Sequence, residues 1–169
     1  DLGNVENTQD MFYGCSTLKS VNFSGDDLGN VTSMEKWMFY GCDALESVNF
    51  SGCNFENLNS MDGVFGEYRA LKSIDFSECN FENLNSVVNM FYGCYALERV
   101  NFSGCNLEKV ADMTGLFFCC DALKSVDFSG IDLGNVENTQ DMFYGCSTLK
   151  SVNFSGCNLG NVTSMWLMF

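Results

Sequence analysis

The amino-acid sequence predicts an α/β solenoid, a coil in which each turn is one copy of a short repeated unit. Three observations support this prediction. A Phe recurs every 26 residues along the 169-residue chain, with a single interval of 27. Each unit contains five residues that alternate between polar and apolar, which is typical of a half-buried strand. An apolar pattern with helical spacing follows each strand. A period of this length marks units that bury their apolar side only by stacking. The recurring residues are Phe12, Phe39, Phe65, Phe91, Phe117, Phe143 and Phe169.

We treat the chain as a single repeat array over residues 1–169. The partial unit 1–10 comes first, the complete units are 11–37, 38–63, 64–89, 90–115, 116–141 and 142–167, and 168–169 begin another unit. Residues 1–25 recur letter for letter as 132–156, which indicates the duplication of a five-unit block. Polar caps of atypical sequence normally close the ends of a solenoid. Neither end resembles such a cap, so we expect a segment of a longer array.

The strand of each unit is predicted at the SVNFS stretch, as in residues 151–155, where Val152 and Phe154 point inward. The surrounding pattern, LxxVxFxxCxL in residues 149–159, recurs in all six units with substitutions. This is the frame of a leucine-rich repeat. The predicted fold is therefore a right-handed, horseshoe-like leucine-rich-repeat solenoid with a parallel β-sheet on one face.

Short helices are predicted on the opposite face of the coil. A Ser such as Ser60 suits a helix N-cap. The apolar residues that follow it lie at i, i+3, i+4 and i+7, along one side of a two-turn helix: Met61, Val64, Phe65 and Tyr68. A Gly at the fourth position of most units suits the helix exit.

The Phe residues at the second and thirteenth positions of the unit are predicted to form two stacked ladders inside the coil. Neighbouring strands lie about 4.8 Å apart, a spacing at which aromatic rings can stack in an offset manner. An aromatic ligand groove is the alternative. The columns are uniform and inward-facing, which favours the core.

Composition argues against several functions. The net charge is −14 with only eight Lys or Arg, so binding to nucleic acid or to anionic membranes is disfavoured by repulsion. No apolar run approaches the roughly 20 residues that cross a bilayer, so no membrane insertion is expected within this segment. The absence of His excludes the Ser-His and Cys-His catalytic arrangements. We predict a protein that is not an enzyme, with no catalytic residues.

Ten Cys residues raise the question of a metal or a redox site. Five occupy the fifth position of the unit and four the sixteenth, and no CxxC motif or His is present. The two columns flank the strand, too far apart for a disulfide within one unit. We therefore predict free thiols that fill the core, with no metal site and no cofactor.

The outward face of the strands is the candidate binding face. A solvated sheet with hydrogen-bonded side chains is one interpretation of it. The other is a regular polar surface for a repetitive ligand, such as a glycan, a like chain or ice. A column that begins Lys19, Glu46, Lys72, Glu98 runs just before it and favours the in-register stack. The candidate residues are Ser20, Asn22, Ser24, Ser47, Asn49, Ser51, Ser73, Asp75, Ser77, Arg99, Asn101, Ser103, Ser125, Asp127, Ser129, Ser151, Asn153 and Ser155.

The combination of MFxxC, LxxVxFS and NVTSM on one 26-residue period resembles the BspA-like leucine-rich-repeat surface proteins. The matching stretches are residues 142–146, 149–155 and 161–165. The strand differs from that family, since it contains VNFS where LDLS is frequent. The resemblance implies a cell-surface or extracellular location and adhesion to host or matrix proteins.

These observations predict a non-enzymatic adhesive scaffold whose partner is a protein or a glycan. The alternative is a self-associating array or filament, in which like chains stack end to end. An ice-binding surface is a third and more distant possibility. A specific recognition face should vary between units, as at Arg69, Tyr95 and Arg99, whereas a filament should stay uniform.

Overall fold

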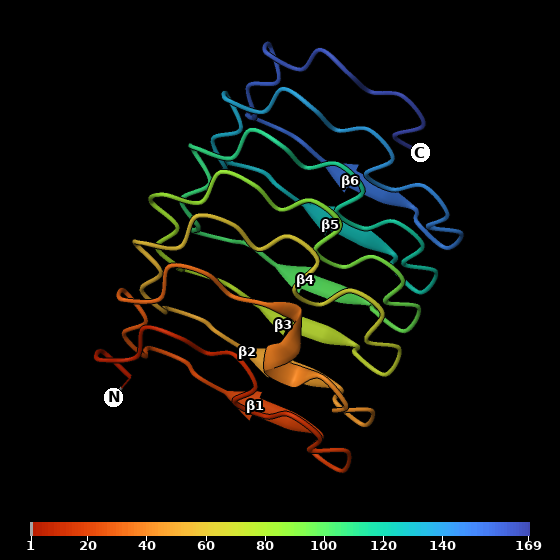
Figure 1. Ribbon diagram of the computed structural model, residues 1–169. Coiled ribbons are helices and arrows are strands. Elements are labelled where there is room, and N and C mark those ends of the chain that lie inside the picture. The colour runs from red at the N-terminus through yellow and green to blue at the C-terminus, as the bar shows by residue number, and fades with distance from the viewer. Residues whose placement is uncertain (1) are drawn as a thin grey trace.

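The computed structural model describes residues 2–169 as a parallel β-solenoid (Figure 1). Each turn of the coil, here called a rung, is formed by one repeat. Six short strands lie along one side, and the two termini lie at opposite ends of the stack. Their bounds are β1 Ser20–Asn22, β2 Ser47–Asn49, β3 Ser73–Asp75, β4 Arg99–Asn101, β5 Ser125–Asp127 and β6 Ser151–Asn153. The predicted solenoid with parallel strands on one face is confirmed.

All strand pairs are parallel and in the register that the repeat predicts. Val48, for example, pairs with Val21 on one side and with Ile74 on the other. The strands form two sheets, β1-β2-β3-β4 and β5-β6. The expected continuous sheet is therefore divided between β4 and β5.

The predicted helices on the opposite face are wrong. Within residues 2–169 the only helix is η1, a 3-10 helix over Lys36–Phe39. Alternate N–H groups of the predicted helical segment bond to the next rung, and those between them close tight turns by bonding three residues back. The N–H of Met61 donates to the carbonyl of Ser86 at 3.0 Å, and that of Phe65 to Met90 at 2.9 Å. The apolar residues with helical spacing still point inward, but they stand on successive tight turns.

Each rung turns sharply at the fourth position of the unit, where the backbone is left-handed. Gly93 has φ of +68°, and the equivalent Cys119 and Glu67 have +57° and +67°. This conformation is readily adopted by Gly and costs other residues about 1–2 kcal/mol. The Gly at the fourth position, which we assigned to a helix exit, thus allows the left-handed turn of the rung.

Replacing Cys119 by Gly should raise the free energy of unfolding by up to about 1 kcal/mol, because the left-handed strain is removed and only part of it is offset by Gly entropy. Urea unfolding measures the change. Gly93→Ala is the matched control, since the new Cβ would meet no atom closer than 3.6 Å. It should lose about 1 kcal/mol. A Cys119→Gly variant less stable than the parent would contradict this account.

The predicted Phe ladders are confirmed. Phe50 and Phe76 stack with ring centroids 5.4 Å apart and planes 2° apart, and Phe91 and Phe117 stack at 5.4 Å and 8°. Both columns lie in one continuous core that extends through the rungs. The widest step in the column at the second position is Phe39 to Phe65, at 6.1 Å and 28°.

That wide step lies where the chain holds one extra residue, between Met34 and Phe39. In most other rungs the residue two before this Phe is Gly, Asn or Asp with positive φ, such as Asn89 at +53°. Trp37 stands there in this rung, and a bulky side chain disfavours that conformation. The chain forms η1 instead.

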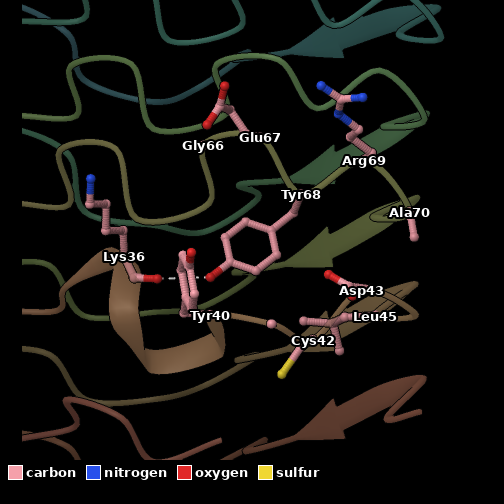
Figure 2. A pocket seen from close by; sticks show the side chains of 11 residues that line it. Lys36, Tyr40, Cys42, Asp43, Leu45, Gly66, Glu67, Tyr68, Arg69 and Ala70 are labelled. Atoms are coloured by element: carbon pink, nitrogen blue, oxygen red, sulfur yellow. Dashed lines mark hydrogen bonds between the residues drawn. The ribbon is translucent and has the colours of Figure 1, made fainter. Parts of the chain in front are cut away.

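The extra residue interrupts the hydrogen bonds between rungs. In the described chain no backbone hydrogen bond joins residues 34–42 to residues 61–68, although the equivalent segments of later rungs are bonded. The phenol of Tyr68 donates to the Lys36 carbonyl at 2.8 Å across the gap (Figure 2).

The duplicated sequence provides an internal comparison. Thr139 donates its N–H to the carbonyl of Ser164 at 3.0 Å, and its hydroxyl to the same oxygen at 3.1 Å. The identical Thr8 lies just before the 27-residue unit in the sequence, and its buried hydroxyl has no hydrogen-bond partner among the described residues. The difference between the two copies follows from the length of the next rung.

Candidate functional site

The strand face consists of the outward side chains of β1–β6 and of the Ser that follows each strand by two residues. All eighteen candidate residues are exposed or half-buried. The strand register aligns them in columns, so Ser47 lies beside Ser20 and Ser73, and Asn49 beside Asn22 and Asp75. The structure therefore brings together the residues that the sequence singled out, within the two sheets.

The middle column, which contains Asn or Asp in every rung, shapes the backbone. The side-chain oxygen of Asn49 accepts the N–H of Ser51 at 2.8 Å, and Asp127 accepts that of Ser129 at 2.8 Å. The same bond occurs in all six rungs, at up to 3.1 Å. These hydrogen bonds lower the pKa of Asp127. Asn and Asp recur here because only short side chains close this local turn.

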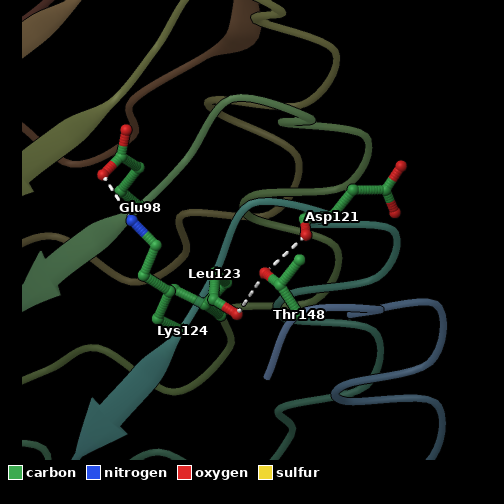
Figure 3. Close-up of polar contacts among 5 residues, drawn as sticks. All are labelled: Glu98, Asp121, Leu123, Lys124 and Thr148. Atoms are coloured by element: carbon green, nitrogen blue, oxygen red, sulfur yellow. Dashed lines mark hydrogen bonds and ion pairs between the residues drawn. The ribbon is translucent and has the colours of Figure 1, made fainter. Parts of the chain in front are cut away.

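The charged column beside the strand face forms two ion pairs in the described residues. Lys72 contacts Glu46 at 2.8 Å, and Lys124 contacts Glu98 at 3.1 Å (Figure 3). The Lys72 ammonium lowers the pKa of the Glu46 carboxyl. Both partners of each pair are about half exposed, so the pairs favour the register more than they add stability. In Figure 3 the Thr148 hydroxyl also joins its rung to the preceding one, by donating to the Asp121 and Leu123 carbonyls.

All ten thiols are free, and eight of them form a contact that the sequence did not reveal. The Sγ–H of Cys79 donates to the carbonyl of Phe50 at 3.0 Å, and that of Cys94 donates to Phe65 at 2.9 Å. The same contact recurs along both columns. Each such thiol therefore joins its rung to the preceding one through a weak hydrogen bond. No cluster of three or more metal-ligating side chains occurs in residues 2–169.

Thiol reactivity should separate the buried from the accessible Cys residues. We expect a maleimide probe to label Cys15 in the native protein and to leave six buried Cys unlabelled until the protein unfolds. Cys15 is exposed, and Cys119, Cys146 and Cys157 are half-buried, so uniform burial was a wrong expectation for these four. Mass mapping of the labelled sites is the measurement. Rapid native labelling of Cys94 or Cys120 would contradict the burial.

The sequence reasoning missed an exposed aromatic column at the third position of the unit. Tyr13 stacks on Tyr40 with centroids 5.5 Å apart, and Phe118 lies between Tyr92 at 5.4 Å and Tyr144 at 5.1 Å. The four Tyr are 40–58% exposed. The recurrence of Tyr directly after the Phe of the unit was the signal. Gly66 occupies this position in the remaining rung.

Together, the strands in register, the inward Phe ladders and the LxxVxFxxCxL frame define a protein of the leucine-rich-repeat class. The chain belongs to the family described as Mycoplasma protein of unknown function, DUF285, whose sequence profile matches residues 1–103 and again residues 59–169. No curated protein matches the sequence. No helix in residues 2–169 is long and apolar enough to cross a membrane.

Several solved structures are similar to the chain, and two of them are leucine-rich proteins. One is a leucine-rich repeat protein from Bacteroides ovatus ATCC 8483, with 20% identity and a TM-score of 0.48, covering 87% of this chain and 40% of that protein. The other is a leucine rich cell surface protein from Faecalibacterium prausnitzii A2-165, with 15% identity and a TM-score of 0.38, covering 85% and 62%. The chain thus spans less than two thirds of either protein.

Proposed function

We propose that the chain is a non-enzymatic adhesive scaffold of a cell-surface or secreted protein, and that the strand face binds a protein or glycan ligand. The observation that supports this most is the alignment of hydroxyl and amide groups in register along β1–β4 and along β5–β6. Such a surface offers hydrogen-bonding groups at the regular interval of one rung. Repeat proteins commonly use extended faces of this kind for recognition.

The location is proposed from the sequence motifs. The MFxxC, LxxVxFS and NVTSM stretches resemble the BspA-like surface proteins, which implies display outside the cell and adhesion. The ionisable side chains on the strand face have no His beside them. This composition favours binding over acid–base catalysis.

The test is binding of the chain to arrays of immobilised glycans and extracellular-matrix proteins. Ser103→Arg and Ser129→Arg each place a long charged side chain on the exposed strand face, and each should weaken any specific binding. Ser147→Arg is the matched control, since it makes the same change at an exposed turn outside the face. Equal effects of all three variants would contradict a binding role for the strand face.

Self-association is a second candidate function. The rung that contains Trp166 and Phe169 leaves these side chains 63% and 70% exposed, and a hollow of about 240 Å³ lies beside Phe169, Phe154 and Leu149. Apolar patches favour association with another surface. We expect this chain to associate with itself as its concentration rises, and a fused polar cap on that rung to suppress the effect. Sedimentation that gives a strict monomer over the micromolar range would exclude it.

A further inference from the structure

The exposed aromatic column lacks one ring at the place where the rung-to-rung hydrogen bonds are interrupted. Tyr40 is 49% exposed and is stacked by Tyr13 of the preceding rung. The Trp37 ring of the same rung lies beside Tyr40, with centroids 5.0 Å apart and planes tilted by 48°. The next position of the column is Gly66, which has no side chain to stack on Tyr40.

A pocket of about 680 Å³ lies between these two rungs. Tyr40, Cys42 and Asp43 line it from one rung, and Gly66, Tyr68 and Arg69 from the next. Figure 2 shows the Tyr40 and Tyr68 rings in its centre, with Lys36 and Arg69 on opposite sides. The volume is within the range of small-molecule sites. It exceeds that of one aromatic ring, so a substituted ring can enter.

The pocket also contains polar groups that the fold leaves available. In later rungs the N–H at the fourth position bonds to the next rung, as Gly93 does to Phe118 at 2.8 Å. Among residues 2–169 the equivalent N–H of Gly41 has no backbone partner, and the carbonyl of Gly66 accepts no backbone N–H. A ring with a hydroxyl or N–H at its edge can bond to such groups while it stacks.

We propose that this pocket binds one planar aromatic ring of the phenol or indole class, which stacks on Tyr40 in the position that a side chain at residue 66 would fill. The ring completes the aromatic column, and its polar edge reaches the backbone of Gly41 and Gly66. The ring comes either from a free small molecule or from a Tyr or Trp side chain of a partner polypeptide. This site is separate from the strand face.

The test is an amide-shift titration of the full chain by NMR, with p-cresol as the probe. Saturable shifts should centre on Gly41, Gly66 and Tyr68. The same concentration of 4-methylcyclohexanol, which has a similar size but no π-system, should produce no such shifts. Equal shifts with both compounds, or shifts spread evenly over the aromatic column, would overturn the proposal.

Two variants test the stacking partner. Gly66→Tyr supplies the missing ring from the chain itself, and Tyr40→Leu removes the platform, so each should weaken p-cresol binding by about tenfold or more. Tyr144→Leu is the matched control, since it removes a ring of the same column outside the pocket, and it should leave binding unchanged. A Cβ at position 66 would lie 3.3 Å from the Gly63 carbonyl oxygen. If this close contact prevents Gly66→Tyr from folding, Tyr40→Leu alone tests whether the ring stacks on Tyr40. Unchanged binding in Tyr40→Leu would refute the site.

A third ligand distinguishes the two sources of the ring. N-acetyl-tyrosinamide carries the same phenol on a peptide backbone. Binding at least as tight as that of p-cresol supports a side chain of a partner polypeptide, whereas exclusion of the amide with retained p-cresol binding supports a free small molecule. Absence of binding by both compounds and by indole would overturn the proposal. These results are independent of the strand-face variants, so this site can fail while the adhesive function holds.

Discussion

Phe102→Ala should lower the free energy of unfolding by about 3–5 kcal/mol. The ring is 5% exposed and stacks between Phe76 and Phe128, with both centroid distances at 5.8 Å. Its removal leaves a cavity and breaks two ring contacts in the middle of the ladder, where the rungs on both sides restrict collapse. Because small domains are stable by only about 5–15 kcal/mol, this loss is a large share of the total.

Ser103→Ala is the matched control, one residue further along the chain. Ser103 is exposed, and its hydroxyl donates only to the side chain of Asn101, at 2.9 Å. The substitution should change stability by no more than about 0.5 kcal/mol. Urea unfolding of both variants measures the difference. Similar costs for the two would mean that the inward and outward faces of the strand are exchanged.

Alkaline pH should unfold the protein through its thiols. Burial raises the pKa of Cys53 to about 11, and the pKa values of Cys94 and Cys105 to about 12, from about 9 in the unfolded chain. All three are at most 8% exposed. Their stabilising contribution is complete below pH 9 and is lost as pH rises through the folded-state pKa, because the unfolded chain releases its protons first.

The magnitude follows from the linkage relation. Each thiol should lower the free energy of unfolding by about 1.4 kcal/mol per pH unit between its unfolded and folded pKa values. Three thiols thus remove several kcal/mol between pH 9 and pH 11. Urea unfolding in the presence of reductant, at pH 8, 9, 10 and 11, measures the slope.

The control is the variant with Cys53, Cys94 and Cys105 replaced by Ala. Its stability at neutral pH should be lower than that of the parent, because packing and the thiol hydrogen bonds are lost. Its decline with pH should be shallower, by about 1.4 kcal/mol per pH unit for each thiol removed. Equal slopes for parent and variant would exclude the thiols as the cause.

The sequence predicted the strands and the core because both depend on a pattern within one unit. Val152 and Phe154 alternate with polar residues, and the same alternation recurs in each rung. The strand-face residues were located for the same reason. The Asn and Asp column was expected to be polar and outward, and its bonds to the Ser N–H groups agree with the interpretation as a hydrogen-bonded polar sheet.

The helices were predicted wrongly because the spacing i, i+3, i+4 is also produced by successive tight turns. Phe65 and Tyr68 point inward in either structure. What decides between them is the partner of each N–H, and the Phe65 N–H bonds to Met90 in the next rung. Periodicity within one unit cannot reveal a hydrogen bond between units.

The pocket could not be predicted for a related reason. The sequence shows an extra residue before Phe39. Whether this residue opens a pocket depends on which backbone hydrogen bonds form with the next rung. The absence of a ring at Gly66 matters only because Gly66 stacks next to Tyr40, which lies 26 residues away in the sequence. Both features belong to the contact between rungs.

Amide hydrogen exchange tests the central claim most directly. That claim is that backbone hydrogen bonds between repeats hold the rungs together on the face opposite the strands, except between residues 34–42 and 61–68. The structure predicts slow exchange at Phe65, Phe91 and Phe117, whose N–H groups bond to the next rung at 2.9–3.0 Å. It predicts fast exchange at Met34 and Gly41, which face the interruption. Strong protection of Met34 and Gly41, equal to that of Phe91 and Phe117, would contradict it.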